Sequence, residues 1–184
     1  MSSLERRQRG LLDLVKNRGS ATGDPYLQRV ANSRQLAMVR KIALWWRAVS
    51  LEAQCRLTAG LLKKLGCLDS LAADYFDRNA TSPFIEELSL GFLASLRDHD
   101  DPLIRAMSQF EFALLKARAG SAEMCEIEWD RNPDLVVLAL QSGGELPARE
   151  PNCRYRMQVS RDLQGMVACS RESAAHERTR RHPA

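Results

Sequence analysis

The apolar residues of this sequence follow one spacing up to Gly120 and a different spacing after it. Before Gly120 they recur every three or four residues, as on one face of a helix. After it, Cys125, Ile127 and Trp129 alternate with acidic residues, as in a strand with one buried face. The sequence therefore predicts an α+β fold, in which an N-terminal bundle of five or six helices precedes a small, mostly antiparallel sheet of about three strands.

Capping residues, prolines and glycines indicate where the helices begin and end. These signals are Asp24-Pro25, Ser50, Gly66, Ser82-Pro83, Asp101-Pro102 and Gly120. The helices are expected over residues 4–18, 25–48, 51–65, 69–78, 83–97 and 102–119. Residues 25–48 carry apolar side chains over a wide arc, which predicts a helix buried on two sides at the centre of the bundle.

The region after residue 120 contains one ambiguous segment and one predicted hairpin. Residues 133–142 form either a short helix, favoured by Asn132-Pro133 and the glycines at 143–144, or a strand. The alternation at residues 154–159, the turn at 162–165 and the apolar residues at 166–170 predict a hairpin. We thus expect a helical domain over 1–120, a β subdomain over 121–170 and a tail over 171–184 whose composition predicts disorder.

Composition and charge narrow the class of protein. Hydrophobic residues make up 45% of the chain, enough for a core, and no secretory signal or membrane-length apolar run is apparent. We expect a soluble cytoplasmic protein. The net charge of +4 comes from the two ends, because residues 19–170 hold eighteen basic and nineteen acidic groups. That balance argues against a nucleic-acid partner, because a protein surface that binds nucleic acid needs clustered basic residues.

Residues suited to catalysis or metal binding are few. The five cysteines contain no CxxC pair, which favours free thiols over a zinc site or a disulfide framework. His99 lies among three aspartates and fits either a divalent-metal cluster or, as we favour, a helix connection capped by Asp101. No phosphate loop or hydrolase motif is present. The sequence therefore predicts no catalytic residue, no metal ligand and no cofactor in this chain.

Trp45 and Trp46 allow two interpretations. They could stack on nucleotides, but adjacent helical positions point about 100° apart, which predicts that one surface cannot use both rings. We favour a place in the core or in a partner interface.

The predicted sheet should leave a strand edge unpaired, and such an edge can bind an extended peptide through main-chain hydrogen bonds. The residues assigned to peptide binding are Arg154, Tyr155, Arg156, Met157, Val159 and Val167. Tyr155, Met157 and Val159 would pack beside apolar peptide residues. Arg154 and Arg156, on the other strand face, would contact a partner protein or solvent.

An ordered series of segments over about residues 25–170 is similar to one known family. The segments are Val39 to Arg47, Asp101-Pro102, Phe110 to Ala117, Ile127 to Trp129, Asn132-Pro133, Pro147 to Pro151 and Tyr155 to Ser160. In these the chain resembles the MbnC family, the small partner proteins of the iron oxidase in methanobactin biosynthesis.

The resemblance implies a heterodimer with a larger TIM-barrel iron oxidase (MbnB-like) that holds the iron. Together the two would convert cysteines of an MbnA-like precursor peptide into oxazolone and thioamide groups of methanobactin, a copper-binding natural product. The small subunit would be non-catalytic and would help to bind the leader segment of the precursor. It implies no catalytic residue at any position here.

Two other classes of function remain open at the level of sequence. A helical DNA-binding transcriptional regulator would use the basic ends as arms, although the body is nearly neutral. A stand-alone metalloenzyme would use His99 and its neighbouring aspartates.

Overall fold

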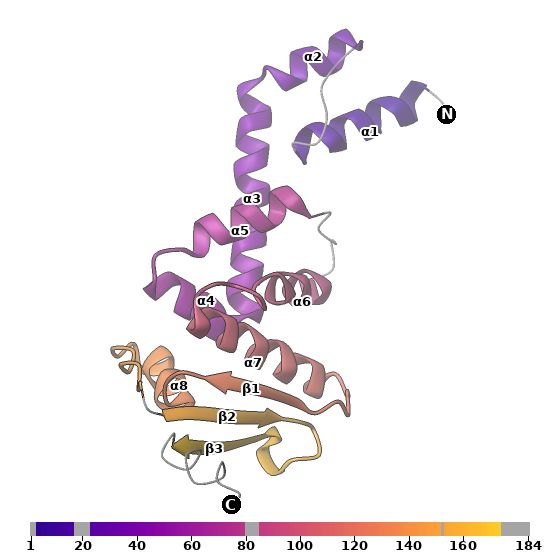
Figure 1. Ribbon diagram of the computed structural model, residues 1–184. Coiled ribbons are helices and arrows are strands. Elements are labelled where there is room, and N and C mark those ends of the chain that lie inside the picture. Colours follow the sequence, from indigo (N-terminus) through magenta and orange to yellow (C-terminus); the bar gives the residue numbers. More distant parts are fainter. Residues whose placement is uncertain (1–2, 17–22, 80–84, 152, 174–184) are drawn as a thin grey trace, which may run out of the picture. The chain divides into compact units, whose positions relative to one another are not determined.

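A computed structural model describes residues 3–16, 23–79, 85–151 and 153–173 (Figure 1). Within these residues the helices come first and a three-stranded antiparallel sheet follows, which confirms the predicted α+β fold. The elements are α1 (Ser3–Val15), α2 (Pro25–Ala31), α3 (Arg34–Gln54), α4 (Arg56–Lys64), α5 (Leu68–Arg78), α6 (Ile85–Ser95), α7 (Pro102–Arg118), β1 (Cys125–Trp129), α8 (Pro133–Ser142), β2 (Cys153–Val159), η1 (Gln164–Met166) and β3 (Val167–Ser173). No described helix is both long enough and apolar enough to cross a bilayer.

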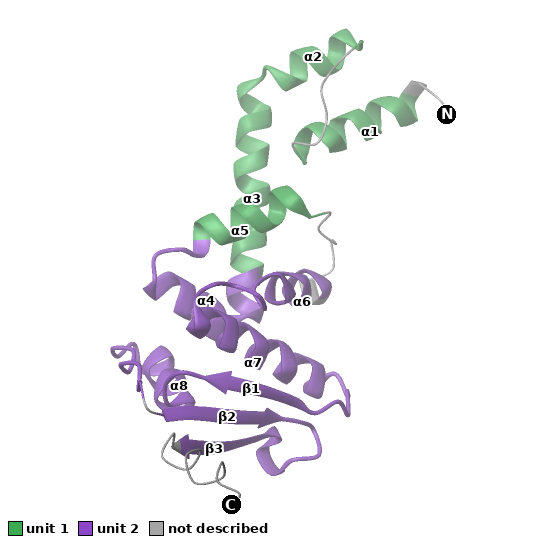
Figure 2. Ribbon diagram, in the orientation of Figure 1, with its two compact units in different colours: residues 1–50, 69–81 green, residues 51–68, 82–184 purple. Residues whose placement is uncertain are grey.

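The chain divides into two compact units (Figure 2). Unit 1 comprises residues 1–50 and 69–81, and unit 2 comprises residues 51–68 and 82–184. The division falls inside α3 and at the start of α5, whereas the sequence predicts a boundary at residue 120. The helices α4, α6, α7 and α8 therefore belong to the same unit as the sheet.

In unit 2, α7 covers one face of the sheet, where it packs on β1 and β2, and it also packs on α4 and α6. The Phe110 ring of α7 meets the Trp129 ring of β1 edge-on, with 6.0 Å between ring centroids. Ile127 and Met157, which are cross-strand neighbours, are almost fully buried on this face. This burial specifies the register of the strands, because a slip of one residue would turn these side chains toward solvent.

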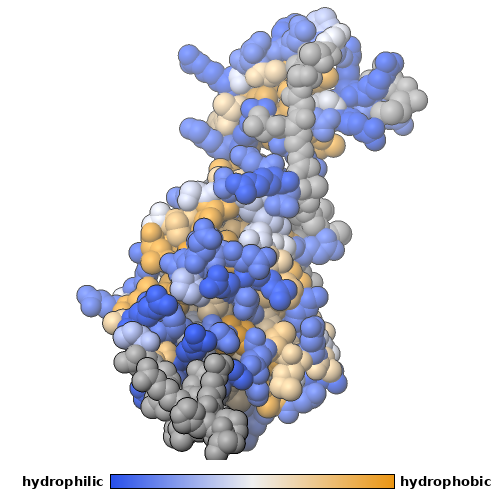
Figure 3. Space-filling view, in the orientation of Figure 1, coloured by the Kyte–Doolittle hydropathy of each residue, from blue (hydrophilic) through white to orange (hydrophobic). Residues whose placement is uncertain are grey.

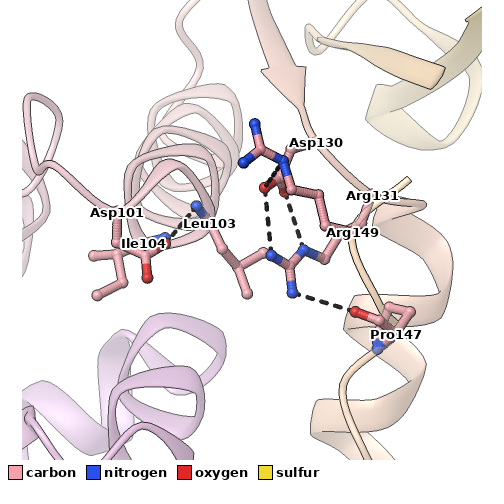
Figure 4. Close-up of polar contacts among 7 residues, drawn as sticks. All are labelled: Asp101, Leu103, Ile104, Asp130, Arg131, Pro147 and Arg149. Carbon is pink, nitrogen blue, oxygen red and sulfur yellow. Dashed lines mark hydrogen bonds and ion pairs between the residues drawn. The ribbon is translucent and has the colours of Figure 1, made fainter. Parts of the chain in front are cut away.

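The predicted starts of α7 and α8 are confirmed by capping hydrogen bonds. The Asp101 carboxylate accepts from the backbone N–H groups of Leu103 and Ile104, at 2.8 and 3.3 Å (Figure 4). The Asn132 side chain accepts in the same way from the first turn of α8. Gly143 ends α8 in the left-handed conformation, with φ of 75°. Residues 133–142 therefore form a helix, the favoured of the two alternatives.

The helix α4 begins later than the sequence predicts, because Ser50 lies within α3 and is not its N-cap. Cys55 precedes α4 and offers no side-chain cap. The carboxylate of Glu111 on α7 takes that role, accepting from the N–H groups of Leu57 and Thr58 at 3.0 and 2.8 Å. A cap supplied by a distant helix leaves no signal in the neighbouring sequence.

The helix predicted over residues 25–48 is interrupted, so that α2 and α3 are separate. The Ser33 hydroxyl donates to the Val30 carbonyl at 2.7 Å and accepts from the Leu36 N–H at 3.2 Å. It thereby closes one helix and caps the next. Ser33 is thus a capping signal that the sequence prediction missed.

The prediction that this region forms the buried centre of a bundle is wrong for α3. Four apolar side chains along one face of α3 are exposed: Met38, Ile42, Trp45 and Val49. Another face is used inside unit 1. There the Arg40 Nε donates to the Leu14 carbonyl at 2.8 Å, and the Arg47 guanidinium lies 5.5 Å from the centroid of the Phe76 ring.

Two predicted ends remain to be placed. The predicted helix start at Ser82-Pro83 lies outside the described residues, and α6 is described from Ile85. The last strand continues beyond the predicted end at Ser170, to Ser173. Residues 174–184 lie outside the described residues.

Candidate functional site

The strand β3 lies at an edge of the sheet. The strand order is β1-β2-β3, so β2 is central, and β3 has no partner on its outer side among the described residues. The turn that joins β2 to β3 contains Gly165 and Met166, both with positive φ. An edge strand presents unpaired main-chain N–H and C=O groups.

The hydrogen bonds of this hairpin show which main-chain groups are free. The Ser160 N–H donates to the Met166 carbonyl at 3.1 Å, which makes these two residues a hydrogen-bonded pair. Bonded and non-bonded pairs alternate along antiparallel strands, so the register places Val167, Cys169 and Arg171 in non-bonded pairs. Their main-chain groups therefore point away from β2, where an added strand would bind.

The side chains of these three residues continue the helix-facing side of the sheet, but they are less covered than their neighbours on β2. Val167 is half-buried, and Cys169 and Arg171 are exposed. The residues opposite them on β2 are Val159, Met157 and Tyr155, all of which are buried. Of the apolar residues assigned to peptide binding from the sequence, only Val167 therefore lies at the edge. The other three belong to the core that supports it.

The helix α8 leaves further apolar side chains open in unit 2. Leu135 and Leu138 are large and exposed. Burial, and after it the nearby carboxylate of Asp134, raises the pKa of the Cys169 thiol.

Arg171 anchors the C-terminal half of β3. Its guanidinium donates to the Glu150 carboxylate at 3.2 Å and to the Cys153 Sγ at 3.0 Å. It also lies 5.8 Å from the centroid of the Tyr155 ring, whose hydroxyl donates to Glu150 at 2.9 Å. These contacts hold the edge strand in place, which lowers the entropy lost when a peptide binds.

A second anchor lies at the end of β1 (Figure 4). The Asp130 carboxylate pairs with Arg131 at 3.0 Å and with Arg149 at 3.4 Å. Arg131 also donates to the Pro147 carbonyl at 3.2 Å. The network fastens the segment after α8 to the sheet.

Arg154 and Arg156 lie on the opposite face of the sheet, as the sequence predicts from the alternation of β2. The Arg156 guanidinium pairs with Glu126 on β1 at 3.0 Å and with Glu172 on β3 at 3.6 Å. Arg156 therefore links all three strands, and neither arginine shares the face on which Val167 lies.

Trp45 and Trp46 are both exposed, at 58% and 59%, so they are not core residues of unit 1. Their ring centroids lie 5.1 Å apart in an edge-to-face arrangement. The prediction that one surface cannot use both rings is therefore wrong, because the two rings form one aromatic patch. Apolar surface is visible among hydrophilic side chains in both units (Figure 3).

His99 takes part in the start of α7. Its Nδ1 accepts from the Asp101 N–H at 3.0 Å, and the Asp101 carboxylate caps the helix, which confirms the predicted cap. Across the part of the chain that the structure describes, no three His, Cys, Asp or Glu side chains form a group able to hold a metal ion.

Cys169 and Arg171 were not predicted as site residues. The alternation of β3 could have indicated them, but the predicted strand ended before Arg171, and no sequence signal identifies β3 rather than β2 as the edge.

Comparisons with family models, with curated proteins and with solved structures found no match to this chain.

Proposed function

We propose that this chain is a non-catalytic subunit of an iron-dependent oxidase that modifies a peptide, as the resemblance to the MbnC family implies. In this proposal the iron belongs to the larger MbnB-like partner. The present chain binds the leader of an MbnA-like precursor, so that the partner can convert the precursor's cysteines into oxazolone and thioamide groups during methanobactin biosynthesis.

The observation that carries the proposal is the open edge of β3. Val167, Cys169 and Arg171 direct their main-chain groups away from β2. On its other side β3 pairs with β2, whose helix-facing side chains are buried. An extended leader added there would gain main-chain hydrogen bonds that demand little of its sequence.

Selectivity would come from the side chains at and near the edge. Alternate residues of the added strand would face the same side as Val167 and Cys169. Apolar leader residues on that side would bury the surface of Val167 that is now open. Arg156, on the opposite face with Arg154, would contribute by holding the strands together through its ion pairs with Glu126 and Glu172.

The proposal is tested by titrating a synthetic leader peptide into the chain and into two variants at one position. Cys169→Pro removes an outward N–H that the fold does not use, and we expect about tenfold weaker leader binding. Cys169→Ala keeps the N–H and changes only a small side chain, so it should bind the leader more tightly than the proline variant does. Thermal unfolding of both variants checks that the fold survives.

Equal affinity of the two variants would rule out strand addition at β3. A proline at Met157 is not a useful test, because Met157 lies in the central strand and its pairing with β1 would be lost. Failure to associate with the oxidase, combined with DNA retention that declines with salt, would instead favour the DNA-binding alternative.

A further inference from the structure

The helix α3 carries an apolar stripe that its own unit does not cover. Met38, Ile42, Trp45 and Val49 are separated by four, three and four residues, which is the spacing of positions d and a in a heptad repeat. All four are exposed, and Val39 and Trp46 widen the stripe on one side. At 1.5 Å per residue the stripe is about 16 Å long.

The face of α3 opposite the stripe is already occupied. Arg40 and Arg47 are seven residues apart and therefore lie on one face. Arg40 donates to the Leu14 carbonyl of α1, and Arg47 stacks on the Phe76 ring of α5. The apolar side chains of the stripe are therefore not left open by a loosely attached helix, because α3 is held by its other face.

The stripe is bordered by positive charge. Arg34 and Lys41 occupy the positions that flank it, both are exposed, and neither forms an ion pair with another described residue. Residues 34–50 contain no acidic residue. In paired helices the flanking positions select the partner by charge. A partner helix with acidic flanking residues therefore fits this face.

We propose that the α3 stripe is a docking face for an amphipathic helix of the partner protein, with apolar residues along its centre and Glu or Asp beside them. The proposal rests on the proposed function, in which the chain acts as a subunit, and it adds the chemistry of the surface that receives it. A second copy of this chain fits less well, since an antiparallel pair would bring Lys41 near its own copy.

The first experiment uses two synthetic helices as probes. Both are about 21 residues long with Leu at positions a and d, and they differ only in carrying Glu or Lys at the flanking positions. We expect the Glu peptide to bind the full chain about tenfold more tightly than the Lys peptide. Binding should shift the tryptophan emission to shorter wavelength, because Trp45 and Trp46 would become buried whereas Trp129 is buried already.

A charge exchange makes the test specific. The double variant Arg34→Glu, Lys41→Glu should reverse the preference, so that the Lys peptide binds more tightly. Ile42→Asp should weaken the binding of both peptides, because it places a carboxylate in the apolar stripe. Equal binding of the two peptides, or an unchanged preference in the double variant, would overturn the proposal.

Other occupants would give different results. Co-sedimentation with phosphatidylserine vesicles without binding of either peptide would assign the stripe to a membrane surface, and a dimer disrupted by Ile42→Asp would assign it to a second copy. Each result overturns the proposal. The leader titration is independent of it: a double variant that still binds the leader and still joins the oxidase would refute the docking face while leaving the proposed function in place.

Discussion

The helices α3 and α7 carry the same apolar spacing, but the side chains at these positions are exposed in α3 and mostly buried in α7. In α3 the stripe is Met38, Ile42, Trp45 and Val49, and in α7 the matching positions are Leu103, Met107, Phe110 and Leu114. Met107 and Phe110 are buried against elements of their own unit, whereas Ile42 and Trp45 are exposed. The spacing predicts that a face will be buried, but it does not indicate whether the chain itself or another protein buries it.

The borders of the two stripes also differ. Beside its apolar face α7 carries Glu111, which is buried and caps α4. Beside its stripe α3 carries Arg34 and Lys41, which are exposed. A helix whose polar groups beside the apolar face bond within its own unit belongs to a core, whereas exposed charges of one sign beside an apolar stripe are typical of an interface.

The largest difference in stability between variants of the two helices is expected when aspartate replaces Met107 of α7 and Ile42 of α3, which occupy the same heptad position. Met107→Asp would bury a carboxylate in a site with no exposure, and we expect a loss of more than about 4 kcal/mol in the free energy of unfolding. Denaturant unfolding followed by circular dichroism measures it. A cooperative transition at the original midpoint would show that α7 is not the core helix.

A smaller loss is expected for Phe110→Ala. This change removes a ring that packs edge-on against Trp129, and it should cost about 3–5 kcal/mol. The same unfolding experiment applies, with Phe110→Leu as the control that keeps most of the buried volume. If alanine and leucine cost the same, packing at this site contributes little.

The pH dependence of stability should separate the buried carboxylate of α7 from ordinary surface groups. Burial raises the pKa of Glu111 above the usual value of 4.5, against the opposing effect of its hydrogen bonds to Leu57 and Thr58. The unfolded chain then releases this proton at lower pH than the folded chain does. The contribution of Glu111 is therefore fully present below pH 4.5 and declines as the pH rises toward its folded pKa.

The comparison with Glu111→Gln isolates this effect. The glutamine variant has no proton to release, so the stability of the original protein relative to it should fall as the pH rises from 4.5. Denaturant unfolding at several pH values measures the difference. A difference that is constant with pH would show that burial does not perturb this carboxyl.

The features that the sequence predicted correctly depend on neighbouring residues. The starts of α7 and α8 follow from Asp101 and Asn132, each placed before a proline, and the sheet face follows from alternation in β1 and β2. These signals act over a few residues, so a sequence displays them directly.

Apart from the local cap at Ser33, the features that the sequence did not predict depend on tertiary contacts. The start of α4 requires Glu111 from α7, and the exposure of Trp45 depends on what α3 does not touch. The order of the strands decides that Val167 lies at an edge and Met157 in the centre. Alternation within each strand is the same in either case, so the candidate peptide site could be predicted only as a hairpin.

The smallest effects on stability are expected for the α3 stripe. Ile42→Asp and Trp45→Ala change side chains that are 46% and 58% exposed, and each should alter the free energy of unfolding by less than about 0.5 kcal/mol. These variants occupy the same heptad positions as Met107→Asp and Phe110→Ala, so the four together compare the two helices at equal spacing. Acrylamide quenching of the tryptophan fluorescence supplies a second reading, because the loss of Trp45 should reduce the accessible component to that of the exposed Trp46, while the buried Trp129 is unchanged. A loss of several kcal/mol in either α3 variant would mean that the chain itself covers the stripe, and the contrast between α3 and α7 would then disappear.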